Sequence, residues 1–303
     1  MRNMDILFET VSAKGHVCVG LDTAAEYIPP PVRRASRSDA EAVLAYNRAL
    51  IDATVGAAAC YKVQIAYYEE MGIAGLQTYA ATLKHLRKKG ALVIADIKRG
   101  DIADTARRYA KAHFDGDFEA DFVTLSPYMG MDSIEPWLEA AGRLGKGAFV
   151  LMRTSNKGMR DFEYLEVKGR GAGEGGQKRL YEAVGDSLAA LACGRLGKHG
   201  YGDYGAVVGC TEQDEAAAIR ATYGSLFFLI PGYGAQGGAA KTAAMLLKDG
   251  NGGVVNASRS ILKAWALDGI ASEDANMDAA AAAAFRAVIK MRDDIRAALG
   301  SVA

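Results

Sequence analysis

The sequence lacks an excess of charge of either sign, a long apolar run and a leader-like N-terminus. Of 303 residues, 36 are Lys or Arg and 36 are Asp or Glu, so the formal net charge is zero. This balance excludes the strong basic field with which many proteins bind nucleic acid or an anionic membrane. No run approaches the roughly eighteen apolar residues of a membrane span, and no apolar segment marks a signal peptide. We therefore expect a soluble, cytoplasmic protein with neither nucleic acid nor membrane as a partner.

Cysteine and proline are scarce, with four and six residues, whereas glycine occurs 35 times. The cysteines form no C-x-x-C pair and have no histidine at metal-ligand spacing, so we expect no metal site and free thiols in a reducing compartment. Few prolines and many glycines indicate tight backbone positions without proline-rich linkers. The length fits either two ordinary domains or one large α/β barrel.

Short apolar runs rich in Val, Ile, Leu and Phe recur along the chain, each followed by a turn and a helical pattern. Continuous apolar runs are typical of strands covered on both faces, as in parallel sheets. The predicted strands are 16–22, 59–65, 91–98, 121–127, 147–155, 205–210, 226–232 and 252–258. The predicted helices are 39–57 (with Ser38 or Asp39 as N-cap), 72–88, 102–113, 132–142, 176–195, 213–222, 237–248, 260–267 and an amphipathic 275–298.

Strand–helix units that repeat without a change in composition predict one (β/α)8 barrel, a single domain over residues 1–303 with an extra C-terminal helix. The alternative is an open, doubly wound sheet, but the first turn after a strand reads LDTAAEY and lacks G-x-G-x-x-G. The connections 23–38, 113–120 and 156–175 are long, and the last is rich in charge. Long loops after barrel strands lie over the active-site mouth or form lids.

The third strand places Asp96 and Lys98 two residues apart, so that both side chains point to one face. If that face is the barrel interior, the carboxylate and the ammonium share a poorly solvated space and should pair. A purely structural salt bridge is the alternative.

Asp101 and Thr105 are four residues apart and share one helical face, where they could bind a ligand hydroxyl. The alternative for Asp101 is to cap a helix that begins at Ile102. The second strand contributes Lys62 on the face of Gln64, although a lone lysine commonly extends to solvent. Asp22 ends the first strand, where a turn aspartate is equally expected.

The last two strands end in segments that together predict a phosphate site. Residues 231–238 read PGYGAQGG, whose exposed N–H groups, that of Gly237 included, can approach an anion while Gln236 adds an amide donor. Ser258 and Arg259 lead directly into a helix, so backbone donors and a guanidinium converge there. Glycines alone would form a flexible hinge more often than a phosphate site, but the two segments together favour phosphate.

These segments closely resemble the orotidine 5′-phosphate decarboxylase family. The resemblance rests on Asp96-x-Lys98-x-x-Asp101-Ile102-x-x-Thr105, on the P-G-x-G-A-Q-G-G loop and on Arg259-Ser260-Ile261, with Asp22, Lys62 and Thr154-Ser155-Asn156 in order on their strands. The chain length and the sequence segment Asn-Ala-Ser-Arg are similar to those of the longer bacterial branch of the family. Two residues depart from the usual pattern: Lys157 follows Asn156 where many relatives have Pro, and Ser258 stands where shorter relatives often have Gly.

The resemblance implies a cofactor-free and metal-free loss of CO2 from orotidine 5′-monophosphate, which gives UMP in pyrimidine synthesis. By matching position, Lys98 would protonate C6 of the pyrimidine, and Asp96 would lie against the substrate carboxylate. Lys62 and Asp101 would complete an array of alternating charge. The resemblance also implies a homodimer that presents Asp101 and Thr105 to the partner's site. Contacts to substrate would come from Asp22 and Lys62 (ribose), Ser155 (pyrimidine amide edge), and Gln236 and Arg259 with backbone N–H groups of Gly237 and Ser258 (phosphate).

Two other functions remain as alternatives. A sugar-phosphate decarboxylase of the same superfamily uses Mg2+, but such relatives carry an acidic metal ligand on the second strand, where this chain has Lys62. A charged lysine does not bind Mg2+, which disfavours that function. A catalytically silent nucleotide-binding module is disfavoured because all the charged residues needed for the chemistry are present.

Overall fold

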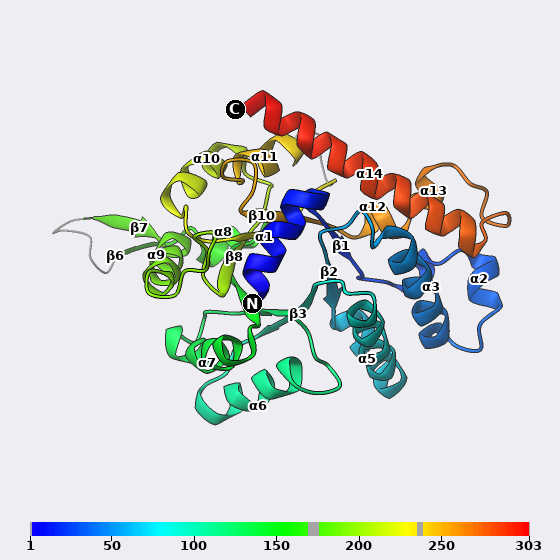
Figure 1. Ribbon diagram of the computed structural model, residues 1–303, viewed down its shortest axis with the longest axis horizontal. Coiled ribbons are helices and arrows are strands. Elements are labelled where there is room, and N and C mark those ends of the chain that lie inside the picture. The colour runs from blue at the N-terminus through cyan, green and yellow to red at the C-terminus, as the bar shows by residue number, and fades with distance from the viewer. Residues whose placement is uncertain (1, 169–175, 235–238, 303) are drawn as a thin grey trace.

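Parallel strands close into a barrel in the computed structural model, which describes residues 2–168, 176–234 and 239–302 (Figure 1). Around the barrel the strands follow the order β1-β2-β3-β4-β5-β8-β9-β10 and return to β1. Their bounds are β1 (Val17–Gly20), β2 (Cys60–Gln64), β3 (Val93–Arg99), β4 (Phe122–Leu125), β5 (Gly147–Arg153), β8 (Tyr204–Val208), β9 (Phe228–Ile230) and β10 (Gly253–Ala257). The predicted (β/α)8 barrel is confirmed, because each strand forms within one of the eight predicted runs or one residue from it.

Helices surround the barrel, and most begin or end within a few residues of the predicted bounds. The longer ones are α1 (Asn3–Lys14), α3 (Asp39–Thr54), α5 (Gly72–Lys88), α6 (Ala103–Phe114), α7 (Glu135–Leu144), α9 (Leu180–Ala192), α10 (Gln213–Thr222), α11 (Ala239–Met245) and α14 (Met277–Val302). At the start of α3, Ser38 accepts a hydrogen bond from the Glu41 backbone N–H, as a helix cap does. None of the described helices is long and apolar enough to cross a bilayer.

The structure corrects several predicted elements. Residues 176–195 are not one helix, since β7 (Gln177–Arg179) precedes α9 and pairs antiparallel with β6 (Glu166–Lys168) in a hairpin that projects from the barrel (Figure 1). The predicted helix 260–267 is two single turns, α12 (Arg259–Leu262) and α13 (Ala264–Leu267). Helix α1 was not predicted.

The barrel interior is layered, and this layering positions the site. Cys18, Cys60, Ile94, Phe122 and Phe149 form an apolar lower layer together with residues of α1, which closes the N-terminal end of the strands. Side chains that point inward recur every second residue along a strand. Two residues further along β2, β3 and β4, the next interior positions are polar. They lie toward the carboxyl ends of the strands, where barrel enzymes carry their sites.

Candidate active site

The centre of the site is the carboxylate of Asp96, which is buried on β3 and accepts hydrogen bonds from four side chains. Lys62 Nζ and Gln64 Nε2 of β2 donate to Oδ2 at 2.9 and 3.0 Å. Lys98 Nζ and Thr124 Oγ1 donate to Oδ1 at 2.6 and 2.8 Å. The predicted Asp96–Lys98 pair therefore forms, and Lys62 and Gln64 share one strand face as expected.

Charge alternates along this cluster, because Lys62 also donates to Asp22 Oδ1 at 3.0 Å. Burial alone would raise the pKa of Asp96, but the Lys62 and Lys98 ammonium groups outweigh it and hold this pKa well below its ordinary value. Burial alone would likewise lower the pKa of Lys62, and the carboxylates of Asp96 and Asp22 outweigh it and raise this pKa. Lys62 and Asp96 are thus both charged at neutral pH.

Lys98 occupies an irregular point of its strand. Its φ of 44° lies in the left-handed region, and the pairing of β3 with β4 shifts register between Ala95 and Arg99. Thr124 Oγ1 holds this bulge by accepting the backbone N–H groups of Ile97 and Lys98 at 3.0 and 2.9 Å. The regular period of two that predicted a shared face is broken here. The bulge nevertheless directs the half-exposed Lys98 side chain back to Asp96.

Asp101 and Thr105 lie beyond the bulge and do not join this cluster. Asp101 Oδ1 accepts the backbone N–H of Ile102 at 2.8 Å, and α6 begins one residue later, at Ala103. Asp101 therefore does not cap a helix at Ile102. Thr105 is exposed on the first turn of α6. Within the described part of the chain, neither side chain forms a hydrogen bond or an ion pair with Lys98.

The wall formed by β1 and β10 carries the residues expected to bind ribose and phosphate. Asp22 Oδ2 accepts a hydrogen bond from Ser258 Oγ at 2.9 Å. Gly20 makes room for this contact, since a Cβ there would lie 2.0 Å from Ser258 Oγ. Arg259 borders a cavity of about 590 Å3 that is shared with Asp22, Tyr27, Tyr67, Gly232, Tyr233, Gly234, Asn256, Ala257, Ser258, Ser260, Lys263 and Leu267. Gln236 and Gly237 lie outside the described residues.

A second, narrower cavity of about 200 Å3 lies over the barrel interior and contains Ser155. It is bordered by Lys62, Asp96, Lys98, Thr124, Leu151, Thr154, Asn156, Val207, Leu229 and Pro231. Charged groups thus lie at one side, and apolar side chains of β5, β8 and β9 at the other. This distribution suits a flat, partly polar ring with its reacting atom toward the lysines.

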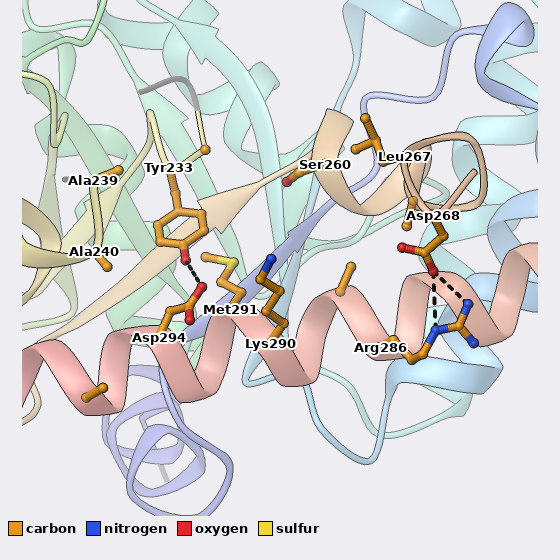
Figure 2. A pocket seen from close by; sticks show the side chains of 14 residues that line it. Tyr233, Ala239, Ala240, Ser260, Leu267, Asp268, Arg286, Lys290, Met291 and Asp294 are labelled. Carbon is orange, nitrogen blue, oxygen red and sulfur yellow. Dashed lines mark hydrogen bonds and ion pairs between the residues drawn. The ribbon is translucent and has the colours of Figure 1, made fainter. Parts of the chain in front are cut away.

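A groove of about 780 Å3 runs along α14, next to the Arg259 cavity, with which it shares Tyr233, Gly234, Ser260 and Leu267. Figure 2 shows Tyr233 pointing toward α14, where its hydroxyl donates to Asp294 Oδ2 at 3.2 Å. In the same groove Arg286 is paired with Asp268 at 2.6 Å. Among the described residues, the lining of this groove contains none of Asp22, Lys62, Asp96 and Lys98.

Sequence reasoning missed two residues that organise the site. Thr124 lies two residues after the interior Phe122, so strand periodicity together with its polarity in an apolar run was an available signal. Glu163, in the long connection after β5, accepts both the backbone N–H and the hydroxyl of Thr154. No spacing in the sequence points to that contact, because Glu163 is one of several charges in an irregular segment.

Fold and site together define a (β/α)8-barrel enzyme with a Lys–Asp–Lys array in the barrel mouth. A sequence profile of the orotidine 5′-phosphate decarboxylase / HUMPS family matches residues 15–273. The chain is 54% identical over 295 residues to the orotidine 5′-phosphate decarboxylase of Clostridium perfringens, covering 97% of this chain and 98% of the relative. It is 50% identical over 292 residues to that of Clostridium kluyveri, covering 96% of each.

Among solved structures, the OMP decarboxylase of Leishmania donovani is 31% identical, with a TM-score of 0.71, covering 97% of this chain and all of that one. The chain belongs to the orotidine 5′-phosphate decarboxylase family. The predicted family, its barrel and its enzyme class, a carboxy-lyase of pyrimidine biosynthesis, are thereby confirmed.

Proposed function

We propose that this chain removes CO2 from orotidine 5′-monophosphate to give UMP, and that Lys98 supplies the proton. The observation that carries the proposal is the Lys98 ammonium at 2.6 Å from Asp96 in the mouth of the barrel. The bond from C6 to the carboxylate breaks, the electron pair stays on C6, and the proton from Lys98 Nζ forms the new C6–H bond. Solvent then returns a proton to the lysine.

The array suits this reaction electrostatically. A developing anion at C6 is stabilised by positive charge that is already fixed in place, because no solvent has to reorganise around it. Asp96 holds the Lys98 ammonium in place through an ion pair, and a second ion pair with Lys62 offsets the negative charge of Asp96. With substrate bound, the Asp96 carboxylate repels the carboxylate that departs, and this repulsion ends as CO2 forms.

Binding of the substrate is divided between the two cavities. We assign the phosphate to Arg259, the Ser258 backbone N–H, and Gln236 and Gly237, of which the last two lie outside the described residues. Asp22 and Lys62 bind the ribose hydroxyls, and Ser155 binds the amide edge of the pyrimidine. The charged Lys62 between two carboxylates supports this assignment over a Mg2+-dependent reaction, since an ammonium group cannot be a metal ligand.

The active unit is a homodimer in which Asp101 and Thr105 complete the partner's site. This proposal is supported by two observations: among the described residues neither side chain is bonded to its own Lys98, and apolar side chains are exposed on the same rim. Ile102 is 48% exposed and Tyr128 is 85% exposed. The loops that carry them are neighbours, because the Ser126 N–H donates to the Arg99 carbonyl at 2.8 Å. We also propose that residues 1–303 act as one domain, in the cytoplasm.

The test is decarboxylation of orotidine 5′-monophosphate by the purified protein in the presence of a chelator, followed as loss of pyrimidine absorbance. The wild type should turn over, and Lys98→Ala should lose at least about a hundredfold in kcat with UMP binding largely retained. Arg259→Ala should raise KM by about tenfold or more and also slow turnover, since charge-assisted bonds to phosphate are lost. No product at micromolar enzyme would refute the assignment. Strict Mg2+ dependence would assign the metal-dependent reaction, and UMP binding without turnover would assign a silent binding module.

A further inference from the structure

The connection between β5 and α9, which the assigned activity does not explain, contacts the border of the pyrimidine cavity through Glu163. It contains α8 (Met159–Phe162), followed by Glu163 and the β6–β7 hairpin. Both carboxylate oxygens of Glu163 are used by Thr154, the first residue after β5. The Thr154 backbone N–H donates to Oε2 at 2.9 Å, and its hydroxyl lies 2.7 Å from Oε1 and also 2.7 Å from Asn156 Oδ1, so it can donate to either. The neighbour of Thr154 in the chain is Ser155.

We propose that Glu163 is a positioning residue that holds Ser155 against the pyrimidine ring by fixing Thr154. The inference rests on the proposed function, in which Ser155 binds the amide edge of the base. Glu163 itself is not among the residues that border the cavity, whereas Thr154 and Ser155 are. Its effect on a ligand therefore passes through Thr154.

Glu163 has a fixed position of its own. Its backbone N–H donates to the Met159 carbonyl at 2.8 Å, and its carbonyl accepts the Tyr181 N–H of α9 at 3.0 Å. The next residue, Tyr164, donates its hydroxyl to Glu215 of α10 at 2.5 Å, and the Arg179 guanidinium lies 4.4 Å from the Tyr164 ring centre. The carboxylate is thus anchored through α9 and α10 rather than on a free loop.

Ser155 is also confined from the opposite side. A Cβ at Gly209, at the end of β8, would lie 2.7 Å from the Ser155 Cβ, so the backbone of β8 packs directly against this serine. The buried Arg153 guanidinium joins the two loops, since it donates to the Gly209 carbonyl and, at 3.4 Å, to that of Thr154. Within the described residues the Ser155 hydroxyl has no hydrogen-bond partner, so it is available to a ligand. A confined, unpartnered hydroxyl is what selective recognition of an amide edge needs.

Two variants break the contact from its two sides. Glu163→Ala leaves the Thr154 N–H without its acceptor and leaves the hydroxyl with Asn156 Oδ1 alone, and Thr154→Val removes the hydroxyl. Thr154→Ser keeps both donors and should restore wild-type behaviour. Glu166→Ala is the matched control, because Glu166 is an exposed glutamate of the same connection with no side-chain partner in the described chain.

The readout compares two ligands by calorimetry, UMP and ribose 5-phosphate, which shares the phosphate but lacks the pyrimidine. Glu163→Ala should raise the Kd for UMP by about tenfold, with a smaller rise for Thr154→Val, and should leave the Kd for ribose 5-phosphate unchanged. The KM for orotidine 5′-monophosphate should rise similarly, with a smaller change in kcat. The double variant should lose less than the sum of the two single variants, since both changes break the Thr154–Glu163 contact.

Equal losses of affinity for both ligands, or a loss equal to that of Glu166→Ala, would show that the connection between β5 and α9 has only a structural role. Either result would overturn the inference. An unchanged UMP affinity would overturn it as well. Failure of the proposed function can be distinguished from failure of this inference. An inactive wild type would refute decarboxylation, whereas the ratio of the two dissociation constants, which tests the role of Glu163, is measured without turnover.

Discussion

Asp96 shows how a single residue holds the site together. Its carboxylate accepts four side-chain hydrogen bonds, two of them from lysines on different strands. A buried carboxylate without such partners would be strongly unfavourable, and the buried Lys62 ammonium left alone would be as well. The Asp96–Lys98 pair is therefore more than a simple salt bridge, because Asp96 both neutralises the buried charge of Lys62 and orients Lys98, the proposed proton donor.

Thr124 provides the sharpest test at this scale. Its hydroxyl donates to Asp96 and accepts the backbone N–H groups of Ile97 and Lys98, so Thr124→Val breaks all three contacts with little change in side-chain volume. We expect kcat to fall by about tenfold or more with KM less affected, because Lys98 loses its orientation. Steady-state kinetics on Thr124→Ser, which keeps the hydroxyl, is the control. Equal activity of Thr124→Val and wild type would show that the bulge does not depend on this residue.

The charged residues of the centre could be predicted from the sequence because a strand has only two faces. Lys62, Gln64 and Asp96 are at alternate positions in apolar runs, so polarity and period together place them in one interior. Thr124 gives the same signal more weakly, and Glu163 gives none, since its partner depends on how an irregular connection folds back. The left-handed backbone of Lys98 could not be predicted either, because it depends on a hydroxyl from the next strand.

At the scale of elements, apolar runs predicted the strands well because every barrel strand is covered on both faces. The hairpin β6–β7 was missed since its short strands, Glu166–Lys168 and Gln177–Arg179, are charged and largely exposed. Helix α1 was missed although Met4, Leu7 and Val11 are spaced helically, because its N-terminus has no side-chain cap to mark a start. Tertiary packing against the bottom of the barrel stabilises it instead.

Helix α14 begins after residue 273, where the family match ends, yet it contacts the segment that borders the Arg259 cavity. Its Asp294 accepts the Tyr233 hydroxyl at 3.2 Å, and burial with the nearby Asp294 charge raises the pKa of Tyr233 (Figure 2). The tyrosine is therefore a neutral donor to the carboxylate at physiological pH. The bond ties the chain after β9 to α14.

We expect Tyr233→Phe and Asp294→Asn each to raise the Kd for UMP by about threefold, because each variant loses one partly exposed hydrogen bond. Binding of uridine, which lacks the phosphate, should not change, because Tyr233 borders the cavity assigned to phosphate. Titration calorimetry with both ligands makes the comparison. The control is Asp268→Asn, which breaks the Arg286 pair in the same groove but leaves Tyr233 in place. A parallel loss of uridine affinity would contradict a phosphate-specific role.

At the scale of the whole molecule, buried histidine makes stability depend on pH. His113 of α6 is 3% exposed and stacks between Phe118 and Trp137, at 5.9 and 6.4 Å between ring centres. Burial, aided by the charge of Arg99, lowers the pKa of His113 to about 4 from an ordinary 6.5. Below pH 6.5 the unfolded chain binds a proton that the folded chain excludes, so stability falls as pH falls from 6.5 toward 4 and is level above 7.

Between pH 7.5 and 5.5 this linkage should cost about 1 kcal/mol of the free energy of unfolding. His113→Phe should remove that part of the slope, and urea unfolding at a series of pH values measures it. A remaining slope is expected from His16, whose pKa burial also lowers. An identical slope in wild type and His113→Phe would show that His113 is solvated or has another proton partner in the folded state.

The proposed homodimer predicts that each active site is shared between two subunits. If Asp101 and Thr105 complete the partner's site, each site combines Lys98 of one subunit with Asp101 of the other. A heterodimer of Lys98→Ala and Asp101→Asn subunits then keeps one site with both residues intact, and loses both residues in the other site. Co-expression with two different affinity tags isolates this heterodimer. It should recover about half the wild-type kcat per dimer, while each homodimeric variant is nearly inactive. If each site uses its own Asp101, both sites of the heterodimer are damaged and no activity returns.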